Sequence, residues 1–325
     1  MEKNERKLLG IDVGGTKTSV CIGDESGKIL VSQRIVTDPQ NGPDECIGRI
    51  LELCKRVLVS ADLKIDDICA VGIAAPGPLD TRTGSLHSPP NMPAWDNVPL
   101  RDMIAKGLGA IVAMNNDANA GALAEFYFGR EKGTENLVYL THSTGMGAGV
   151  IVNGKLLQGV TDTAGEVGHF VLVPNGPLCP CGLKGCFEVF CGGRSTANRL
   201  RTKIERDGVK TAILEKAGGK PENIDFKAFL SAALDGDSFA LEEWNTYIRH
   251  LAHGIGIIIM TLNPEAIILG TIAVHAGAFL LDPLKNALVD YTWGVPGKAC
   301  RISPSTLEGK TGDLGAIAIA LGALS

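Results

Sequence analysis

The chain opens with three short apolar runs separated by turns, a pattern that predicts three successive β-strands at 7–15, 16–24 and 27–36. A helix is predicted at 42–62, because apolar side chains recur there at helical spacing and Pro43 suits a first helical turn. The next predicted elements are a strand at 68–77, a loop rich in proline and glycine at 76–99, a strand at 110–117 and a helix at 118–129. Alternating helices and strands of this kind predict an α/β fold with ligand sites at strand ends.

The same order of elements restarts near residue 136, where 136–159 again gives strand, glycine-rich turn, strand, turn and strand. The turn Asp12–Lys17 has a counterpart in His142–Gly147, and Asp24–Leu30 has one in Val152–Leu157. Glycine-turn hairpins are common, but two similar units ~130 residues apart predict an internally duplicated fold. The elements predicted after the repeat are helices at 194–208, 237–262, 277–291 and 312–324 and a strand at 265–270.

Composition narrows the classes of function. The 325 residues are 45% hydrophobic and 21% charged, which is typical of a soluble globular protein. The net charge of −5 argues against a surface for nucleic acid. No apolar run is long enough for a membrane helix, and the charged N-terminal residues do not resemble a signal peptide, so we expect a cytoplasmic protein. Nine cysteines in a reducing compartment indicate metal binding or catalysis more often than disulfides.

The first glycine turn, DVGGTK, carries groups suited to phosphate. Gly14 and Gly15 let backbone N–H groups approach phosphate oxygens, Thr16 adds a hydroxyl and Lys17 adds a positive charge. Asp12 ends the strand, where its carboxylate can hold Mg²⁺ or the waters of that ion. The turn lacks the spacing of a Walker loop, and a plain hairpin would also fit these residues.

The stretch CPCGLKGCFE concentrates Cys179, Cys181 and Cys186 in eight residues, with His169 ten residues before the first of them. Three thiolates and one imidazole can form a closed tetrahedral zinc site, in which no position remains for a catalytic water. The same cysteines could instead be redox-active or simply buried.

Four motifs, DVGGTK, NNDANAGALAE, TAGEVGH and CPCGLKGCFE, give the chain a resemblance to the ROK family of bacterial-type sugar kinases and repressors. The resemblance runs from Leu8 to Leu324. It implies a two-domain actin-like ATPase (ribonuclease H-like) α/β fold, with a duplicated βββαβαβα unit and a cleft between the domains. The expected smaller domain comprises 1–115 plus 310–325, with hinges near Asn116 and Gly309. The expected larger domain, 116–309, would carry the zinc motif and a homodimer interface.

The resemblance also implies roles for particular side chains. Asp117 matches the family's catalytic base, although its place before a helix would equally suit a helix N-cap. His169 would serve both the sugar and the structural zinc. The loop positions Gly77 and Asn91 could also be turn residues only. The implied sugar ligands are Gly77, Asn91, Asn116, Asp117, Glu166, His169 and Glu188. The implied ligands of ATP and Mg²⁺ are Asp12, Gly14, Gly15, Thr16, Lys17, Thr144, Gly145, Gly147 and Gly270.

Two departures from the family pattern affect the nucleotide side. His142 and Ser143 stand where leucine and glycine are more usual, and the Gly270–Gly277 turn has fewer glycines. The resemblance favours a kinase that transfers the γ-phosphoryl group of MgATP to the 6-hydroxyl of glucose. N-acetylmannosamine, N-acetylglucosamine and fructose are alternative acceptors. A sugar-responsive repressor is less favoured, because the first turn begins at residue 12 and leaves no room for a preceding DNA-binding domain.

Overall fold

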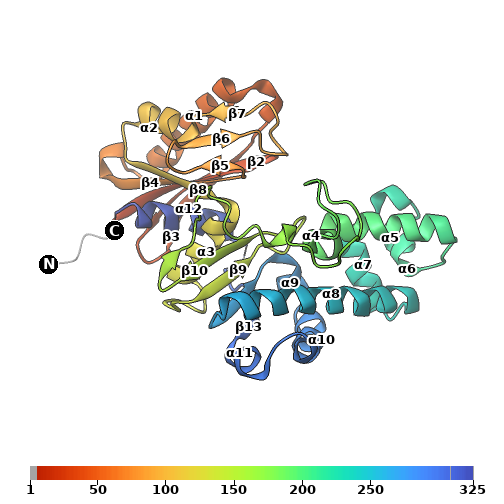
Figure 1. Ribbon diagram of the computed structural model, residues 1–325. Helices are drawn as coiled ribbons and strands as arrows, with labels where there is room; N and C mark the ends of the chain where they lie inside the picture. Colours follow the sequence, from red (N-terminus) through yellow and green to blue (C-terminus); the bar gives the residue numbers. More distant parts are fainter. Residues whose placement is uncertain (1–5, 308, 325) are drawn as a thin grey trace. The chain divides into compact units, whose positions relative to one another are not determined.

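The computed structural model describes residues 6–307 and 309–324, which form two compact units (Figure 1). The first unit combines the chain up to Glu135 with Gly149–Ala164 and the segment from Thr306 onward. The second unit comprises Asn136–Ala148 and Gly165–Ser305. This division follows compactness, so the hinges predicted near Asn116 and Gly309 remain predictions.

The first unit is built on a five-stranded sheet in the order β3-β2-β1-β4-β8. Strands β1 to β3 are antiparallel, whereas β4 and β8 run parallel to β1. Each strand coincides with one predicted from the apolar pattern. Their bounds are β1 Lys7–Val13, β2 Lys17–Asp24, β3 Ile29–Val36, β4 Ile68–Ala75 and β8 Val112–Asn116.

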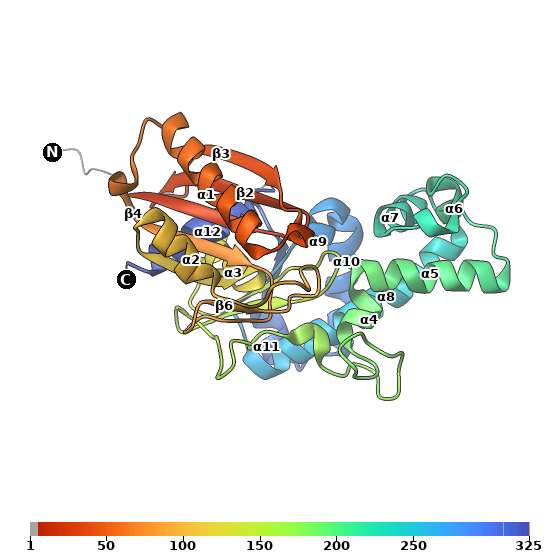
Figure 2. The same cartoon turned by 90° about the horizontal axis from the view of Figure 1, so that it is seen from above.

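Helices cover both faces of this sheet. Alternate residues of β1 point to opposite faces: Leu9 belongs to the core formed with α1 (Pro43–Ser60) and α2 (Leu100–Leu108), and Leu8 packs with α12 (Thr311–Gly322). In the views of Figures 1 and 2, α1 and α2 lie together. Helix α12 also packs against α3 (Asp117–Phe128). Glycine at position 72 permits this approach, because a Cβ there would lie 2.0 Å from the Ala316 carbonyl oxygen.

The prediction of an irregular loop at 76–99 was wrong, because this segment contains a small antiparallel sheet in the order β5-β6-β7. Its core side chains, Leu86 and Trp95, are fully buried. The strands have only two or three residues each, too few for alternation to register in the sequence. They are β5 Leu79–Asp80, β6 Ser85–His87 and β7 Asp96–Val98.

The second large sheet has the order β11-β10-β9-β12-β13. This order repeats that of the first sheet strand for strand, which confirms the predicted duplication. Strands β9, β12 and β13 are parallel. The bounds are β9 Leu137–Leu140, β10 Ala148–Val152, β11 Lys155–Leu156, β12 Ala266–Leu269 and β13 Arg301–Pro304.

Most of the second unit is helical, and α5 to α8 lie together in both views (Figures 1 and 2). The long helix α8 begins after the N-cap Asp237 and supplies Trp244 and Tyr247 to a buried aromatic cluster with Phe226 and Phe229. The predicted helix at 277–291 is α10 followed by a 3₁₀ turn, η5 (Leu288–Asp290). The helices are α4 Phe187–Cys191, α5 Gly193–Asp207, α6 Ala212–Lys216, α7 Phe226–Leu234, α8 Ser238–Leu262, α9 Thr271–Ala276, α10 Ala278–Ala287 and α11 Gly294–Ala299. Across the described residues, none of the helices has the length and apolar character needed to span a bilayer.

Candidate functional site

The first glycine turn joins β1 to β2 and is held tightly from one side. The Gly14 N–H donates to the Lys17 carbonyl at 3.1 Å, and the Thr37 hydroxyl donates to the Gly14 carbonyl at 2.6 Å. A Cβ at Gly15 would lie 2.7 Å from the Asn91 Cβ, so the structure brings Asn91 beside this turn. Among the hydrogen bonds of the described residues, the amides of Gly15 and Thr16 have no protein acceptor. These amides are available to phosphate oxygens.

Asp12 lies at the end of β1 beside the start of α12. A Cβ at Gly312 would lie 2.1 Å from the Asp12 Oδ2 atom, and the buried Asp313 accepts hydrogen bonds from Ser19 at 2.5 Å and Ser32 at 2.8 Å. Burial, followed by the charges of Asp313 and Asp117, raises the pKa of Asp12 to about 6. A carboxylate in such excess negative charge fits a hydrated Mg²⁺ ion, which would neutralise it.

Asp117 is the first residue of α3, whereas the N-cap position belongs to Asn116. The Asn116 side chain accepts a hydrogen bond from the Asn119 amide at 2.7 Å, so the capping role considered for Asp117 falls to its neighbour. Asp117 accepts from the Ala118 amide at 2.8 Å. Its side chain is open to solvent, but the dense protein around it removes part of its hydration, and this desolvation raises the pKa of Asp117.

The remaining groups predicted on the first unit are accessible. Gly77 follows the end of β4, is half-buried, and has no atom within 4 Å of the position that a Cβ would take. Asn91, Thr16 and Lys17 are exposed. These groups therefore have surface available for a ligand.

The second glycine turn, His142–Gly147, is held in the second unit by its carbonyl groups. The carbonyls of His142, Ser143 and Thr144 accept hydrogen bonds at 2.9, 2.9 and 3.0 Å. The three donors are the amides of Ile272, Gly193 and Arg194 in that order. With the carbonyls anchored, the amides of Thr144 and Gly145 remain without a protein acceptor in the described part of the chain. This arrangement presents N–H groups to an anion in the way the first turn does.

Glu188 connects this turn to the cysteine motif. It lies in α4, two residues after Cys186, and its Oε2 atom accepts the Met146 amide at 2.8 Å. A Cβ at Gly145 would lie 2.6 Å from the same oxygen, so the close approach requires glycine there. Glu166 is the N-cap of the short 3₁₀ turn η3 (Val167–His169) and is exposed, whereas His169 is its last residue and is half-buried. The sugar ligands predicted on this unit thus come from two short adjacent elements.

A hollow of about 420 Å³ opens beside the second turn, between α5 and α9. Gly147 and Gly270 are not among its lining residues; Gly270 is buried behind the turn, and a Cβ there would lie 2.2 Å from the Thr141 carbonyl oxygen. The direct role predicted for Gly270 in nucleotide binding therefore stays a prediction. The lining residues are Ser143, Thr144, Gly193, Arg194, Ala197, Asn198, Arg201, Ile224, Asp225, Phe226, Lys227, Thr271 and Ile272.

Sequence reasoning missed the cationic side chains of this hollow. Arg194 follows the glycine pair that starts α5, a position typical of ligand contact, and the sequence Gly192-Gly193-Arg194 could have indicated it. Lys227 lines the hollow from α7, and nothing in the neighbouring sequence indicates this position. The Arg201 guanidinium instead donates to the carbonyls of Pro221 and Glu222, so it holds this segment against α5 at the side of the hollow.

The four predicted metal ligands come together. The ligand atoms of His169, Cys179, Cys181 and Cys186 all lie within 4.8 Å of one another. The Cys181 and Cys186 sulfurs are 3.6 Å apart, and Cys179 Sγ is 3.7 Å from His169 Nδ1. Tetrahedral zinc with Zn–S bonds of about 2.3 Å requires sulfurs about 3.8 Å apart, so the donor set and spacing fit that ion. The ring uses Nδ1 toward the cysteines, which leaves Nε2 for another partner.

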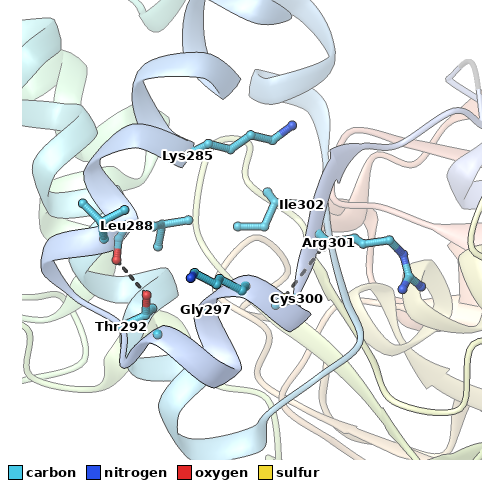
Figure 3. A pocket seen from close by; sticks show the side chains of 10 residues that line it. Lys285, Leu288, Thr292, Gly297, Cys300, Arg301 and Ile302 are labelled. Carbon is cyan, nitrogen blue, oxygen red and sulfur yellow. Dashed lines mark hydrogen bonds between the residues drawn. The ribbon is translucent and has the colours of Figure 1, made fainter.

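A larger hollow in the same unit, of about 550 Å³, lies between α10, η5, α11 and β13 (Figure 3). Lys285 of α10 and Lys298 of α11 line it together with the apolar Leu288 and Ile302. The Thr292 hydroxyl donates to the Leu288 carbonyl (Figure 3). None of the residues predicted for the site lines it. The lining residues are Lys285, Leu288, Val289, Thr292, Gly294, Gly297, Lys298, Cys300, Arg301 and Ile302.

Comparison with known proteins identifies the family of the chain. The family model described as "ROK family" matches residues 8–323. The chain belongs to the ROK family. A glucokinase of Thermotoga maritima is 37% identical over 313 residues, covering 96% of both chains. The solved structure of a ROK family glucokinase from Streptomyces griseus, in complex with glucose and AMPPNP, is 29% identical with a TM-score of 0.80, covering 97% of this chain and 99% of that one.

The family also includes regulators. A xylose repressor of Caldicellulosiruptor bescii is 26% identical, covering 99% of this chain and 79% of that protein. The ROK resemblance and the actin-like ATPase fold predicted from the sequence are confirmed. This ROK protein is an ATP-dependent sugar kinase.

Proposed function

We propose that this ROK protein is a glucokinase that transfers the γ-phosphoryl group of ATP to the 6-hydroxyl of glucose. The observation that carries the proposal is the Asp117 carboxylate, which is open to solvent at the start of α3 and accepts the Ala118 amide. Glucose as the acceptor is supported by the glucokinase relatives.

Asp117 would act as the general base. The carboxylate would accept the proton of the attacking hydroxyl as the phosphoryl group arrives. Its pKa is raised by desolvation, which makes the carboxylate a stronger base than that of an ordinary aspartate. Asn116 cannot do this work, because its amide oxygen is already committed to capping α3 and an amide is not basic.

The two glycine turns would bind the nucleotide phosphates, the first through Gly15 and Thr16 and the second through Thr144 and Gly145. Asp12 would hold Mg²⁺ or its waters, and this ion would neutralise phosphate charge. The hollow of about 420 Å³ beside the second turn, lined by Arg194 and Lys227 among others, would take the nucleoside.

Zinc would be structural in this proposal. The His169 imidazole and three thiolates complete a tetrahedral set, so the ion would order the chain around Glu188 and orient the imidazole. Carboxylates such as Glu166 and Glu188 would accept hydroxyl hydrogen bonds from the sugar, which excludes analogues that lack those hydroxyls.

N-acetylmannosamine, N-acetylglucosamine and fructose remain the alternative acceptors, since these ligand types would suit several hexoses. A sugar-responsive regulator is the second candidate, favoured by the similarity to xylose repressors. A kinase needs a base, and Asp117 provides it, so we favour catalysis. The homodimer and the cytoplasmic location expected from the sequence stay proposals, and size-exclusion chromatography with light scattering tests the first of them.

An ADP-release assay over a panel of hexoses and N-acetylhexosamines tests the proposal. Glucose should give the highest kcat/KM, with zinc measured at about one ion per chain by elemental analysis. A higher kcat/KM for an N-acetylhexosamine would replace glucose as the acceptor. Sugar binding by calorimetry without any turnover would favour the regulator.

A further inference from the structure

The second glycine turn contains a buried polar side chain that a phosphate cradle does not require. His142 has no solvent exposure, and its backbone φ of +38° places it in the left-handed region that favours glycine. A β-carbon in that region carries a cost of roughly 1 kcal/mol or more, so its surroundings must hold it there. The imidazole therefore needs a structural explanation.

That explanation lies in α8. The Nε2 atom of His142 is 2.5 Å from the Tyr247 hydroxyl oxygen, and Tyr247 is also fully buried. The Tyr247 hydroxyl donates in turn to the Cys191 carbonyl at 3.3 Å. Because the hydroxyl has one proton, this network assigns the Nε2–H tautomer to His142 as donor to Tyr247. Burial lowers the pKa of His142 to about 3, so the ring stays neutral in this network.

The network closes a circuit around the turn. Cys191 ends α4, and the next residues, Gly192 and Gly193, begin α5. The Gly193 amide donates to the Ser143 carbonyl, one residue beyond His142. The turn is thus fastened to the short segment 191–194 in two ways: by its backbone, and by the His142 side chain through Tyr247 of α8.

We infer that the His142–Tyr247 hydrogen bond is the brace that holds the second glycine turn in its anion-binding conformation. Both are positioning residues, since neither would touch the nucleotide. The inference rests on the proposed function, because that function supplies the nucleotide that the turn would bind. Neither His142 nor Tyr247 is among the predicted ligands. Without the brace, His142 would leave its left-handed conformation and the amides of Thr144 and Gly145 would lose their alignment.

Tyr247→Phe tests the brace, because it removes one hydroxyl and keeps the ring in the aromatic cluster. We expect KM for MgATP to rise about tenfold, the effect of one lost buried hydrogen bond, with KM for glucose within about twofold. Titration with ADP should show the same loss of affinity. Tyr291→Phe is the matched control, since Tyr291 also stacks on a histidine, His253, at 5.0 Å but outside the turn.

A double-mutant cycle with His142→Leu separates the brace from general packing. The double variant should be no worse in nucleotide affinity than the worse single variant. Should Tyr247→Phe fail to fold, His142→Gln provides a second test, because its amide N–H can still donate to Tyr247. Wild-type affinity for ADP in His142→Gln, with loss in His142→Leu, would support the brace.

Unchanged KM for MgATP in Tyr247→Phe, or an equal rise in KM for both substrates, would overturn the inference. Equal loss of ADP affinity in His142→Gln and His142→Leu would also overturn it. Failure of the proposed function is distinguishable, because it would abolish turnover in the wild-type protein itself. Nucleotide affinity measured by calorimetry still tests the brace in that case.

Discussion

The neutral, buried His142 has a consequence for stability that can be measured without any substrate. An unfolded histidine has a pKa near 6.5, whereas burial lowers the pKa of His142 to about 3 in the folded protein. As pH falls below 6.5, the His142 imidazole binds a proton in the unfolded chain but not in the folded chain. Folding is therefore disfavoured progressively between pH 6.5 and pH 3, and unaffected by this group above pH 7.

The magnitude follows from these two values. Between pH 7.5 and pH 5 the uptake of a proton by the unfolded histidine alone lowers the free energy of unfolding by about 2 kcal/mol. Any folded pKa below about 4 gives nearly the same loss, so the prediction depends on the ring being buried and neutral. Tyr247 is the side chain that contacts this ring, and its hydroxyl stays protonated because burial raises the Tyr247 pKa.

Substitution of His142 by Gln removes the titrating group and keeps an amide donor toward Tyr247. Urea titrations at pH 7.5 and pH 5 should show that wild type loses about 2 kcal/mol more than His142→Gln. Tryptophan fluorescence in a Trp95→Phe background reports the second unit, where Trp244 packs on Tyr247. The exposed His87→Gln serves as the control for loss of one histidine.

Equal losses in wild type and His142→Gln would refute the reasoning. They would mean that the imidazole takes up its proton in the folded state, which requires water or an acceptor at Nδ1. That atom is buried and has no partner among the described residues. An NMR titration of the His142 ring would then show a transition near pH 6.

Three further predictions concern the proposed chemistry. Asp117→Asn should lower kcat by about 10²- to 10⁴-fold with little change in KM for glucose, and an unchanged kcat would remove Asp117 as the base. Because the Asp117 pKa is raised, the acid limb of the wild-type kcat–pH profile should lie above the usual aspartate range. Cys181→Ala should release zinc and raise KM for glucose more than KM for MgATP; equal effects on both substrates would contradict a sugar-side role for the metal. Cys69 is an exposed cysteine outside the cluster, so Cys69→Ala should change neither KM. Gly312→Ala should weaken activation by Mg²⁺ about tenfold because its methyl group would displace the Asp12 carboxylate; normal activation would argue against Asp12 as a ligand of the ion. A methyl group at Gly322 in the same helix meets open space, so Gly322→Ala should behave as wild type.

The sequence predicted the strands of the two large sheets except β13, because most of them are apolar runs and the pattern occurs twice, whereas β13 is short and half polar. It did not predict α2 or the sheet of β5 to β7, whose short segments contain too few turns or alternations for a period to show. Spacing alone placed Cys179, Cys181 and Cys186 together, since eight residues cannot separate far. Local signals were sufficient wherever the contact was local.

The contacts that position the site are long-range, and for this reason they escaped prediction. The Ser19–Asp313 bond joins residues 294 apart, and the His142–Tyr247 bond joins residues 105 apart. Nothing near His142 in the chain shows that its polar ring has a buried partner. Pattern reasoning therefore found Asp12 and the two turns but missed the groups that orient them.

The first unit is assembled from three separated stretches of chain, and α12 belongs to the last of them. During synthesis, the face of its sheet that Ala316 and Ile317 will cover is made early but stays uncovered while ~250 further residues emerge, an interval of tens of seconds at ribosomal rates. The second unit does not depend on α12, because its last stretch ends at Ser305. Newly made chains should therefore present a folded second unit beside an incomplete first one, and a chaperone that protects apolar sheet surface would act on the earlier part of the chain.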